Sequence, residues 1–343
     1  MPSTVTRWSL NIITLVCLIY VYLIVTNQNM PDLSLLVGTN IQSFKIMFIS
    51  IILEAFPFIL IGVLISALLQ TFVPEHVIQR LVPRNPILGV LYACVIGIIF
   101  PICECGMIPV MRRLIHKGMP LYIAVVFIVA GPILNPIVFA STFMAFRSRP
   151  EITYSRMGLA FICALIIGLI VYRFVRSNPL RHSHHEHSHG PTHGHTHEHS
   201  QEEHHHHGGK WNTVLKHSSD EFFEMGKYLV FGAFLAALVQ TMLSREWLVS
   251  VGTGDLSSHF FMMAFAYIIS LCSTSDAFVA SSFISTFSAG SLLSFLVFGP
   301  MLDFKGTLML LAIFKTRFVL ILSLLIFTTV LAASLILERI LFL

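Results

Sequence analysis

Long runs of apolar side chains recur along the whole chain, and they constrain its fold more than any other feature of the sequence. About 20 apolar residues in a row are enough to cross a bilayer as a helix. Lipid offers no hydrogen bonds to the backbone, so such runs must fold into helices that pair their own amide groups. We predict an all-α polytopic membrane protein with about eight to ten transmembrane or re-entrant helices in two homologous halves. The runs are 10–25, 44–72, 87–100, 121–146, 157–175, 228–243, 260–272, 292–301 and 308–337.

The composition agrees with a surface that faces lipid. Of the 343 residues, 55% are hydrophobic and only 11% are charged, whereas a soluble domain carries about 25% charged residues. The mean hydropathy is +0.81. We therefore expect a multi-pass protein of the cell membrane, with the lipid bilayer as a partner and with no nucleic acid among its partners.

The first apolar run is predicted to be a retained helix. Arg7 precedes it, and Thr26-Asn27-Gln28 follows it without a small-x-small cleavage site. Residues 1–33 are therefore interpreted as an extra N-terminal transmembrane helix.

Six cysteines, most of them inside apolar runs, argue against a disulfide framework. They are Cys17, Cys94, Cys103, Cys105, Cys163 and Cys272. Cys17, Cys94 and Cys163 stand alone in predicted helices, where a thiol packs as a small apolar group.

Basic residues give a partial topology. Those around the central loop favour a cytoplasmic position for it: Arg173, Arg176, Arg181, Lys210 and Lys216. Two further clusters cannot both be cytoplasmic if each apolar run is one simple crossing, so some runs are expected to be re-entrant. The clusters are Arg112, Arg113 and Lys117, and Arg147, Arg149 and Arg156.

An ordered set of residues recurs 170 positions later in the chain, which indicates an internal duplication. The first set is Glu54, Gly62, Ala67, Leu68, Gln70 and Thr71, and the second is Glu224, Gly232, Ala237, Leu238, Gln240 and Thr241. We predict one permease repeat at 41–177 and another at 218–343, joined by a loop at 178–217. Duplicated halves are common in secondary transporters, whose substrate site forms between them.

Each predicted half contains two sites where an apolar run is interrupted. In the first half these are 101–106 and 131–136, and in the second they are 272–276 and 299–303. Proline removes a helix hydrogen bond and glycine permits unusual dihedral angles. Backbone freed at membrane depth must find partners in protein or in a wet cavity. The four interruptions therefore predict a central site lined by the polar side chains near them.

Acidic side chains lie close to these interruptions. Glu104, Asp276 and Asp303 lie beside them, Asn135 lies within one, and Glu54 lies inside an apolar run. A carboxylate at a helix centre costs about 2.5–3.5 kcal/mol to insert, so we expect these groups to face an interior and contact substrate. The alternative is a solvated position at the interface, which Lys305 suggests for Asp303.

The sharpest local motif is Cys103-Glu104-Cys105. Thiolates are soft ligands that suit Zn²⁺, Cu⁺ or trivalent arsenic, and a carboxylate extends the choice to harder divalent ions. Two thiols one residue apart reach one ion if the backbone is kinked, and Cys272 from the second half supplies a third. The alternative is plain packing of these thiols.

The central loop carries thirteen histidines among serines, glycines and acidic residues, a composition that cannot bury a core and predicts disorder. Neutral imidazole binds Zn²⁺, Ni²⁺ and Cu²⁺, so this segment is a candidate metal ligand. The histidines are His182, His184, His185, His187, His189, His193, His195, His197, His199, His204, His205, His206 and His207.

Together the motifs resemble the predicted-permease family that includes the organoarsenical efflux permeases. The resemblance rests on four segments, 101–110, 131–136, 275–280 and 298–303, and covers about 44–335. It implies a duplicated helical permease with six residues at the family's motif positions: Cys103, Cys105, Asn135, Cys272, Asp276 and Asp303. Glu104 stands where many relatives carry serine, and with this residue and the histidines the chain resembles a branch associated with zinc or copper efflux.

Three functions remain open at this point. The first is efflux of a soft or borderline metal ion, zinc favoured, driven by an ion gradient because no Walker loop occurs. The second is efflux of trivalent arsenicals or other thiol-reactive molecules, and the third is a membrane metal sensor or scaffold. No HExxH motif or nucleophile elbow occurs, so no enzyme is expected. We expect no tightly bound cofactor beyond zinc or a similar metal as cargo or loop ligand, and a partner membrane subunit is possible.

Overall fold

The computed structural model of the protein describes residues 40–74, 76, 83, 85–99, 103–175, 179–180, 210–242 and 254–341. Within these residues every regular element is a helix, apart from an isolated bridge between Leu180 and Phe314. The predicted all-α fold is confirmed. The extra helix predicted at 1–33 and all thirteen loop histidines lie outside the described residues.

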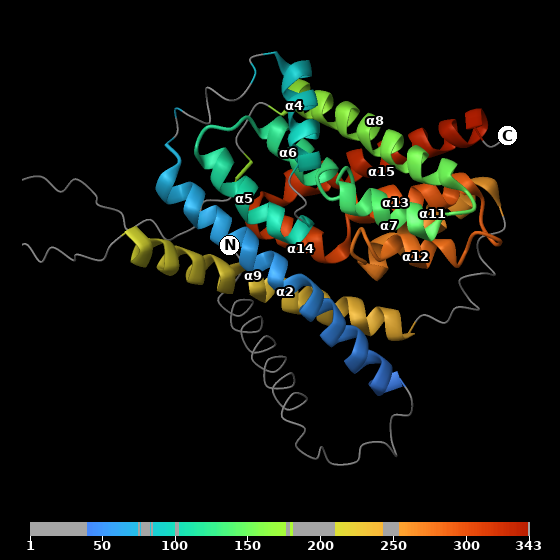
Figure 1. The fold of residues 1–343 in the computed structure, drawn as a ribbon, viewed down its shortest axis with the longest axis horizontal. Coiled ribbons are helices and arrows are strands. Elements are labelled where there is room, and N and C mark those ends of the chain that lie inside the picture. The colour runs from blue at the N-terminus through green and yellow to red at the C-terminus, as the bar shows by residue number, and fades with distance from the viewer. Residues whose placement is uncertain are drawn as a thin grey trace, which may run out of the picture.

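Among the described residues, the helices form two series of six, and Figure 1 shows how they are arranged. The first series, called the first half below, comprises α2 (Asn40–Phe72), α4 (Pro86–Ile99), α5 (Glu104–His116), α6 (Leu121–Ala130), α7 (Pro136–Ala145) and α8 (Pro150–Phe174). The second half comprises α9 (Lys210–Met242), α11 (Asp255–Ile269), α12 (Asp276–Ser281), α13 (Ala289–Met301), α14 (Phe304–Ile313) and α15 (Thr316–Leu341). Each series begins and ends with a long helix and has shorter ones between.

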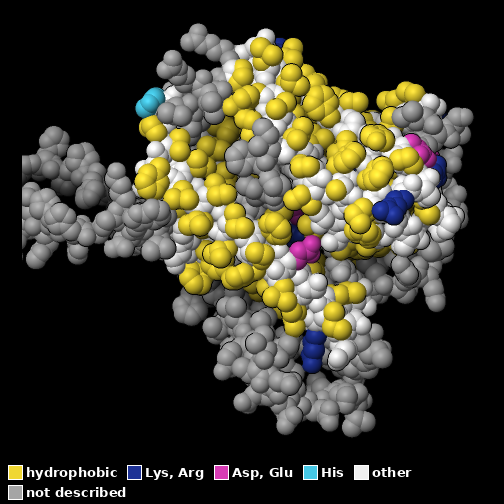
Figure 2. Space-filling view, viewed as in Figure 1, with side chains coloured by type: hydrophobic (Ala, Val, Ile, Leu, Met, Phe, Trp, Pro, Cys, Tyr) yellow, Lys and Arg dark blue, Asp and Glu magenta, His cyan; other side chains and the backbone are white. Residues whose placement is uncertain are grey.

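Five segments of the described chain are long and apolar enough to cross a membrane, and shorter apolar helices lie between them. Hydrophobic side chains are spread widely over the described part of the face shown in Figure 2, with few charged ones among them. In the segment Ala289–Ile313, 72% of the apolar stretch is buried, against 33% in Thr316–Ile340. The protein is therefore a multi-pass membrane protein in which Ala289–Ile313 lies inside the bundle and α15 faces outward.

The long helices α2 and α9 run antiparallel along each other (Figure 1). The rings of Phe48 and Phe234 lie 6.0 Å apart, and those of Phe56 and Phe222 lie 5.5 Å apart. Residue numbers rise along α2 as their partners' numbers fall along α9, which fixes the opposite directions.

The helices α8 and α15, which end the two halves, are antiparallel as well. Cys163 Sγ lies 4.0 Å from the Thr329 carbonyl oxygen. Near the other end of the pair, the Lys315 amide donates to the Pro179 carbonyl at 2.9 Å. Matching helices of the two halves thus have opposite directions, an arrangement found in secondary transporters with inverted repeats. The division into duplicated halves at 41–177 and 218–343 stays a prediction from the sequence.

Two apolar runs are broken near their middle, as the sequence predicts. The first stops at the end of α6 and resumes at α7, whose N-cap Asn135 accepts a hydrogen bond from the Val138 amide at 2.8 Å. The second stops at the end of α13 and resumes at α14, whose N-cap Asp303 accepts from the Gly306 amide at 2.6 Å. Each polar N-cap replaces a hydrogen bond that the broken helix lacks. Pro300 is still helical, so this second break begins at Leu302.

The predicted end of the central loop at 217 is wrong, because α9 already begins at Lys210. The first part of α9 is polar, so apolar periodicity gives no signal for it. Further along α9, Glu221 accepts a hydrogen bond from Ser66 at 2.8 Å and pairs with Arg113 at 3.5 Å. Next to it, Glu224 pairs with Arg112 at 3.1 Å.

Candidate functional site

One small cavity lies where elements of both halves meet, with a volume of about 20 Å³, enough for about one water molecule or ion. Three thiols, two carboxylates and one ammonium group line it, among apolar side chains of α2. These groups belong to Cys103, Cys105, Cys272, Glu54, Glu104 and Lys305. The sequence therefore predicted five of the six, and the structure brings them together from distant parts of the chain.

Helix α5 presents its N-terminus to the cavity. Cys103 is its N-cap, with φ −69° and ψ 165°, and its carbonyl oxygen accepts from the Met107 amide at 3.0 Å. Glu104 and Cys105 follow in the first turn, where both are buried. The unpaired amides and dipole of a helix N-terminus stabilise a negative charge, so a carboxylate or a thiolate is favoured at this point. The Cys103 and Cys105 side chains both line the cavity.

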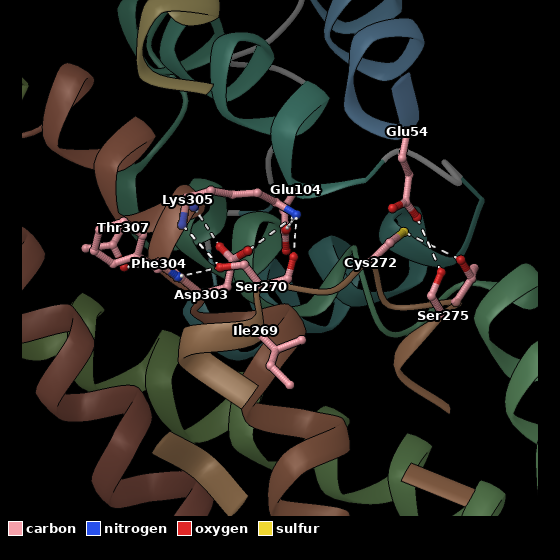
Figure 3. A network of polar contacts seen from close by, with 12 residues as sticks. Glu54, Glu104, Ile269, Ser270, Cys272, Ser275, Asp303, Phe304, Lys305 and Thr307 are labelled. Atoms are coloured by element: carbon pink, nitrogen blue, oxygen red, sulfur yellow. Dashed lines mark hydrogen bonds and ion pairs between the residues drawn. The ribbon is translucent and has the colours of Figure 1, made fainter. Parts of the chain in front are cut away.

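The segment between α11 and α12 forms another wall. Cys272 lies here, with the Thr274 hydroxyl 3.5 Å from its sulfur. Ser275 donates to the Glu54 carboxylate of α2 at 3.4 Å (Figure 3). The cavity therefore joins the first half's α2 and α5 to the irregular backbone of the second half.

Lys305 closes the remaining side, and 5% of the residue is exposed. Its Nζ lies 3.4 Å from Glu104 Oε1 and 3.5 Å from Asp303 Oδ2, as Figure 3 shows. It also donates to the Ser270 carbonyl oxygen at 3.0 Å. Because Glu104 belongs to α5 and Lys305 to α14, this ion pair links the two halves.

Three of the predicted site residues do not line the cavity. Asp303 lies behind Lys305 as the α14 N-cap, and Asn135 caps α7. Asp276 pairs with Arg156 at 2.7 Å, and both side chains are buried. A direct contact of these three residues with substrate stays a prediction.

The thiols and carboxylates share a cavity without forming a ready coordination shell. Among the described residues, no three histidine, cysteine, aspartate or glutamate side chains are placed so that they could hold a metal ion. The described cysteines, namely Cys94, Cys103, Cys105, Cys163 and Cys272, are free thiols. A metal ion entering this cavity would have to draw its ligands together.

A family pattern for predicted permeases, ArsP_1, matches residues 40–339 and so includes every described part of the cavity. The chain belongs to this family. The permease is 48% identical over 292 residues to the UPF0718 protein YcgR of Bacillus subtilis (strain 168), covering 85% of this chain and 95% of the relative. It is also 36% identical over 273 residues to a putative two-component membrane permease complex subunit of Streptococcus mutans serotype c, covering 80% and 87%. No solved structure matches it.

Two site residues of this permease were missed by sequence reasoning. In the sequence Lys305 suggests solvent beside Asp303, whereas in the structure it is buried in the cavity wall. Arg156 was assigned to a basic loop cluster, but it lies buried inside α8, where it pairs with Asp276 and donates to the Ser273 carbonyl at 3.2 Å. A basic residue that directly precedes an apolar run gives no sequence signal of whether it faces the bundle.

Two matching glycines let the long helices approach the site. A Cβ on Gly62 of α2 would lie 2.5 Å from the Cα of Gly106 in α5. A Cβ on Gly232 of α9 would lie 3.0 Å from the Lys305 Cβ. Each long helix therefore packs directly on one of the two helices that carry the Glu104–Lys305 ion pair.

Replacing Gly62 with alanine is expected to destabilise this permease by about 1–3 kcal/mol, because backbone meets backbone and neither side can yield. The matched control is Gly158→Ala in α8, where an added Cβ would meet nothing within 4 Å. There the change should be neutral or stabilising by about 0.5–1 kcal/mol, the usual gain for alanine over glycine in a helix. Thermal unfolding in detergent measures both variants. Equal unfolding temperatures for the two would contradict the close approach of α2 and α5.

Proposed function

We propose that this permease exports a soft or borderline metal cation, with zinc favoured, through the cavity between its halves. The observation that carries the proposal is the donor set of the cavity, in which three thiols and two carboxylates face one space. Thiolate and carboxylate together suit Zn²⁺ and related ions. A purely apolar cargo would gain nothing from them.

The arrangement of the halves supports a transport mechanism. Discontinuous helices and antiparallel matching helices are features of transporters in which one half rocks against the other around a central site. The Glu104–Lys305 pair crosses between the halves at that site. We infer that an ion gradient supplies the energy, since the sequence holds no phosphate-binding loop for ATP.

A trivalent arsenical is the second candidate cargo. The observation that favours it is the presence of three thiols, because trivalent arsenic is a thiophilic centre. In that case the carboxylates would only stabilise the folded protein, and the loop histidines would have no part in transport. The further alternative, a membrane metal sensor or scaffold, predicts binding without flux.

The loop histidines and a partner subunit complete the proposal. We propose that the thirteen histidines collect metal ions near the permease, since imidazole binds them readily. A second membrane subunit is proposed as well, because the streptococcal relative is named as a subunit of a two-component complex. If the isolated chain transports cargo, this second subunit is not needed for the path itself.

Flux into liposomes that contain the purified permease tests the function. Zn²⁺, Cd²⁺, Cu⁺ and arsenite are offered separately, with and without a proton gradient, and empty liposomes serve as the control. Saturable, gradient-dependent flux of Zn²⁺ and Cd²⁺ is the expected result. Flux of arsenite alone would replace the metal cargo by the arsenical, and binding without flux of any of them would favour the sensor.

A further inference from the structure

The ammonium group of Lys305 is held at the cavity by Ser270. Ser270, at the end of α11, has φ 51° and ψ 46°, and it is the one non-glycine residue with positive φ in the described chain. Its carbonyl oxygen accepts from Lys305 Nζ at 3.0 Å. Its hydroxyl oxygen accepts from the Phe304 amide at 3.1 Å. In this left-handed conformation Ser270 contacts both the Phe304 amide at the start of α14 and the Lys305 ammonium group, and so holds Lys305 in place.

The negative charges around Lys305 outnumber its single positive charge. Glu54 and Glu104 line the cavity with Lys305, and Asp303 Oδ2 lies 3.5 Å from its Nζ. Three carboxylates and one ammonium group leave a net charge of −2 when all are ionised. The ammonium group shares this cavity with the Cys105 and Cys272 thiols. It therefore stands among the groups that would bind a metal cation.

We infer that Lys305 is a tethered cation that fills the cargo site between transport events, and that the cargo is a divalent cation that displaces it from Glu104. This inference rests on the proposed metal transport and narrows its cargo. A divalent ion carries more charge than the ammonium group and gains thiol ligands that the ammonium group cannot use. A neutral arsenical has no charge with which to displace it.

Displacement also connects cargo to the movement of the halves. With Lys305 on Glu104, an ion pair joins α14 of the second half to α5 of the first. When the cargo takes Glu104, that link is replaced by bonds to the cargo. When the cargo leaves, Lys305 returns and prevents the buried carboxylate from remaining unpaired, which would be unfavourable.

The test compares the cation affinity of the cavity in four full-length variants. Zn²⁺ and Cd²⁺ are titrated while the alkylation of Cys103 is followed by mass spectrometry, because this readout reports the cavity and not the loop histidines. Lys305→Met removes the tethered cation. Lys305→Met/Asp303→Asn removes it with one carboxylate, so the net charge stays at −2 while asparagine keeps the α14 N-cap. Lys305→Arg keeps the charge, and Lys315→Met removes an exposed lysine at the start of α15.

The expected result is an apparent dissociation constant lower by about tenfold or more in both variants that lack Lys305. Their flux should fall, because the cargo then leaves slowly. The arginine and Lys315 variants should stay near the wild type. If Lys305→Met does not fold, Lys305→Gln takes its place, since glutamine can still donate to Ser270.

The outcomes distinguish a failure of the proposed displacement of Lys305 from a failure of the proposed metal transport. If the wild type transports Zn²⁺ but Lys305→Met and the double variant bind it no more tightly, the displacement is wrong and metal transport stands. If only Lys305→Met binds more tightly, net charge explains the effect and the displacement is also wrong. If the wild type neither transports nor binds Zn²⁺ or Cd²⁺ in the cavity, the proposed function falls and this inference falls with it.

Discussion

Replacing Cys103 and Cys105 together with serine is expected to lower metal flux by about 100-fold or more, with little change in stability. Serine keeps the size and hydrogen-bonding reach of cysteine but is a poor ligand for a soft metal ion. Loss of a supporting group near a metal already reduces affinity by about 10–100-fold, and here two direct ligands are lost. Flux into proteoliposomes at matched protein density measures the effect.

The matched control is Cys94→Ser/Cys163→Ser. Both of these residues are buried, in α4 and α8, and neither lines the cavity. Removing two thiols from packed positions should reduce stability somewhat while leaving the flux per folded protein unchanged. Equal losses of flux in the two double variants would show that the cavity thiols have no special role.

Replacing Arg156 with methionine is expected to destabilise the protein by about 3–5 kcal/mol, because it leaves the buried Asp276 carboxylate unpaired. The Arg156 guanidinium is fully buried, donates to the Thr142 hydroxyl at 2.7 Å and pairs with Asp276 at 2.7 Å. It also holds the Ser273 carbonyl, next to Cys272 in the cavity wall. This loss should therefore also lower flux in whatever protein still folds.

An exposed ion pair provides the control for Arg156. Arg149 pairs with Glu151 at 3.0 Å, but their side chains are 40% and 49% exposed. Arg149→Met should change stability by about 0–1 kcal/mol, the usual range for surface pairs. A second comparison is Arg156→Met/Asp276→Asn, which removes the unpaired charge and should recover part of the loss. If Arg156→Met is no more destabilising than Arg149→Met, the buried pair does not stabilise the junction of the halves.

The sequence predicts the fold where hydrophobicity and helix-breaking residues act locally. The breaks before Asn135 and Asp303 fall close to where proline and glycine interrupt the apolar runs, since those residues change backbone geometry in any surroundings. The start of α9 at Lys210 was not predictable in this way. Its first turns are rich in polar residues, and such turns leave no apolar periodic pattern in a single sequence.

The site was predictable as a set of anionic and thiol groups, but not as an arrangement. The carboxylates of Glu54 and Glu104, and the three cysteine thiols as soft metal ligands, are candidates from the sequence. All five side chains line the cavity. The partners that balance the carboxylates, Lys305 and Arg156, come from the opposite half in each case. Because the pairing depends on which helices meet across the bundle, only the structure reveals it.

Protection of cysteines from alkylation tests whether a metal cargo binds in the cavity between the halves. The wild-type permease in detergent is treated with an alkylating reagent, with and without Zn²⁺, and each cysteine peptide is quantified by mass spectrometry. We expect Zn²⁺ to slow the alkylation of Cys103, Cys105 and Cys272 and to leave that of Cys94 and Cys163 unchanged. Zn²⁺ bound to the protein with no protection of the three cavity cysteines, or with equal protection of all five, would contradict it.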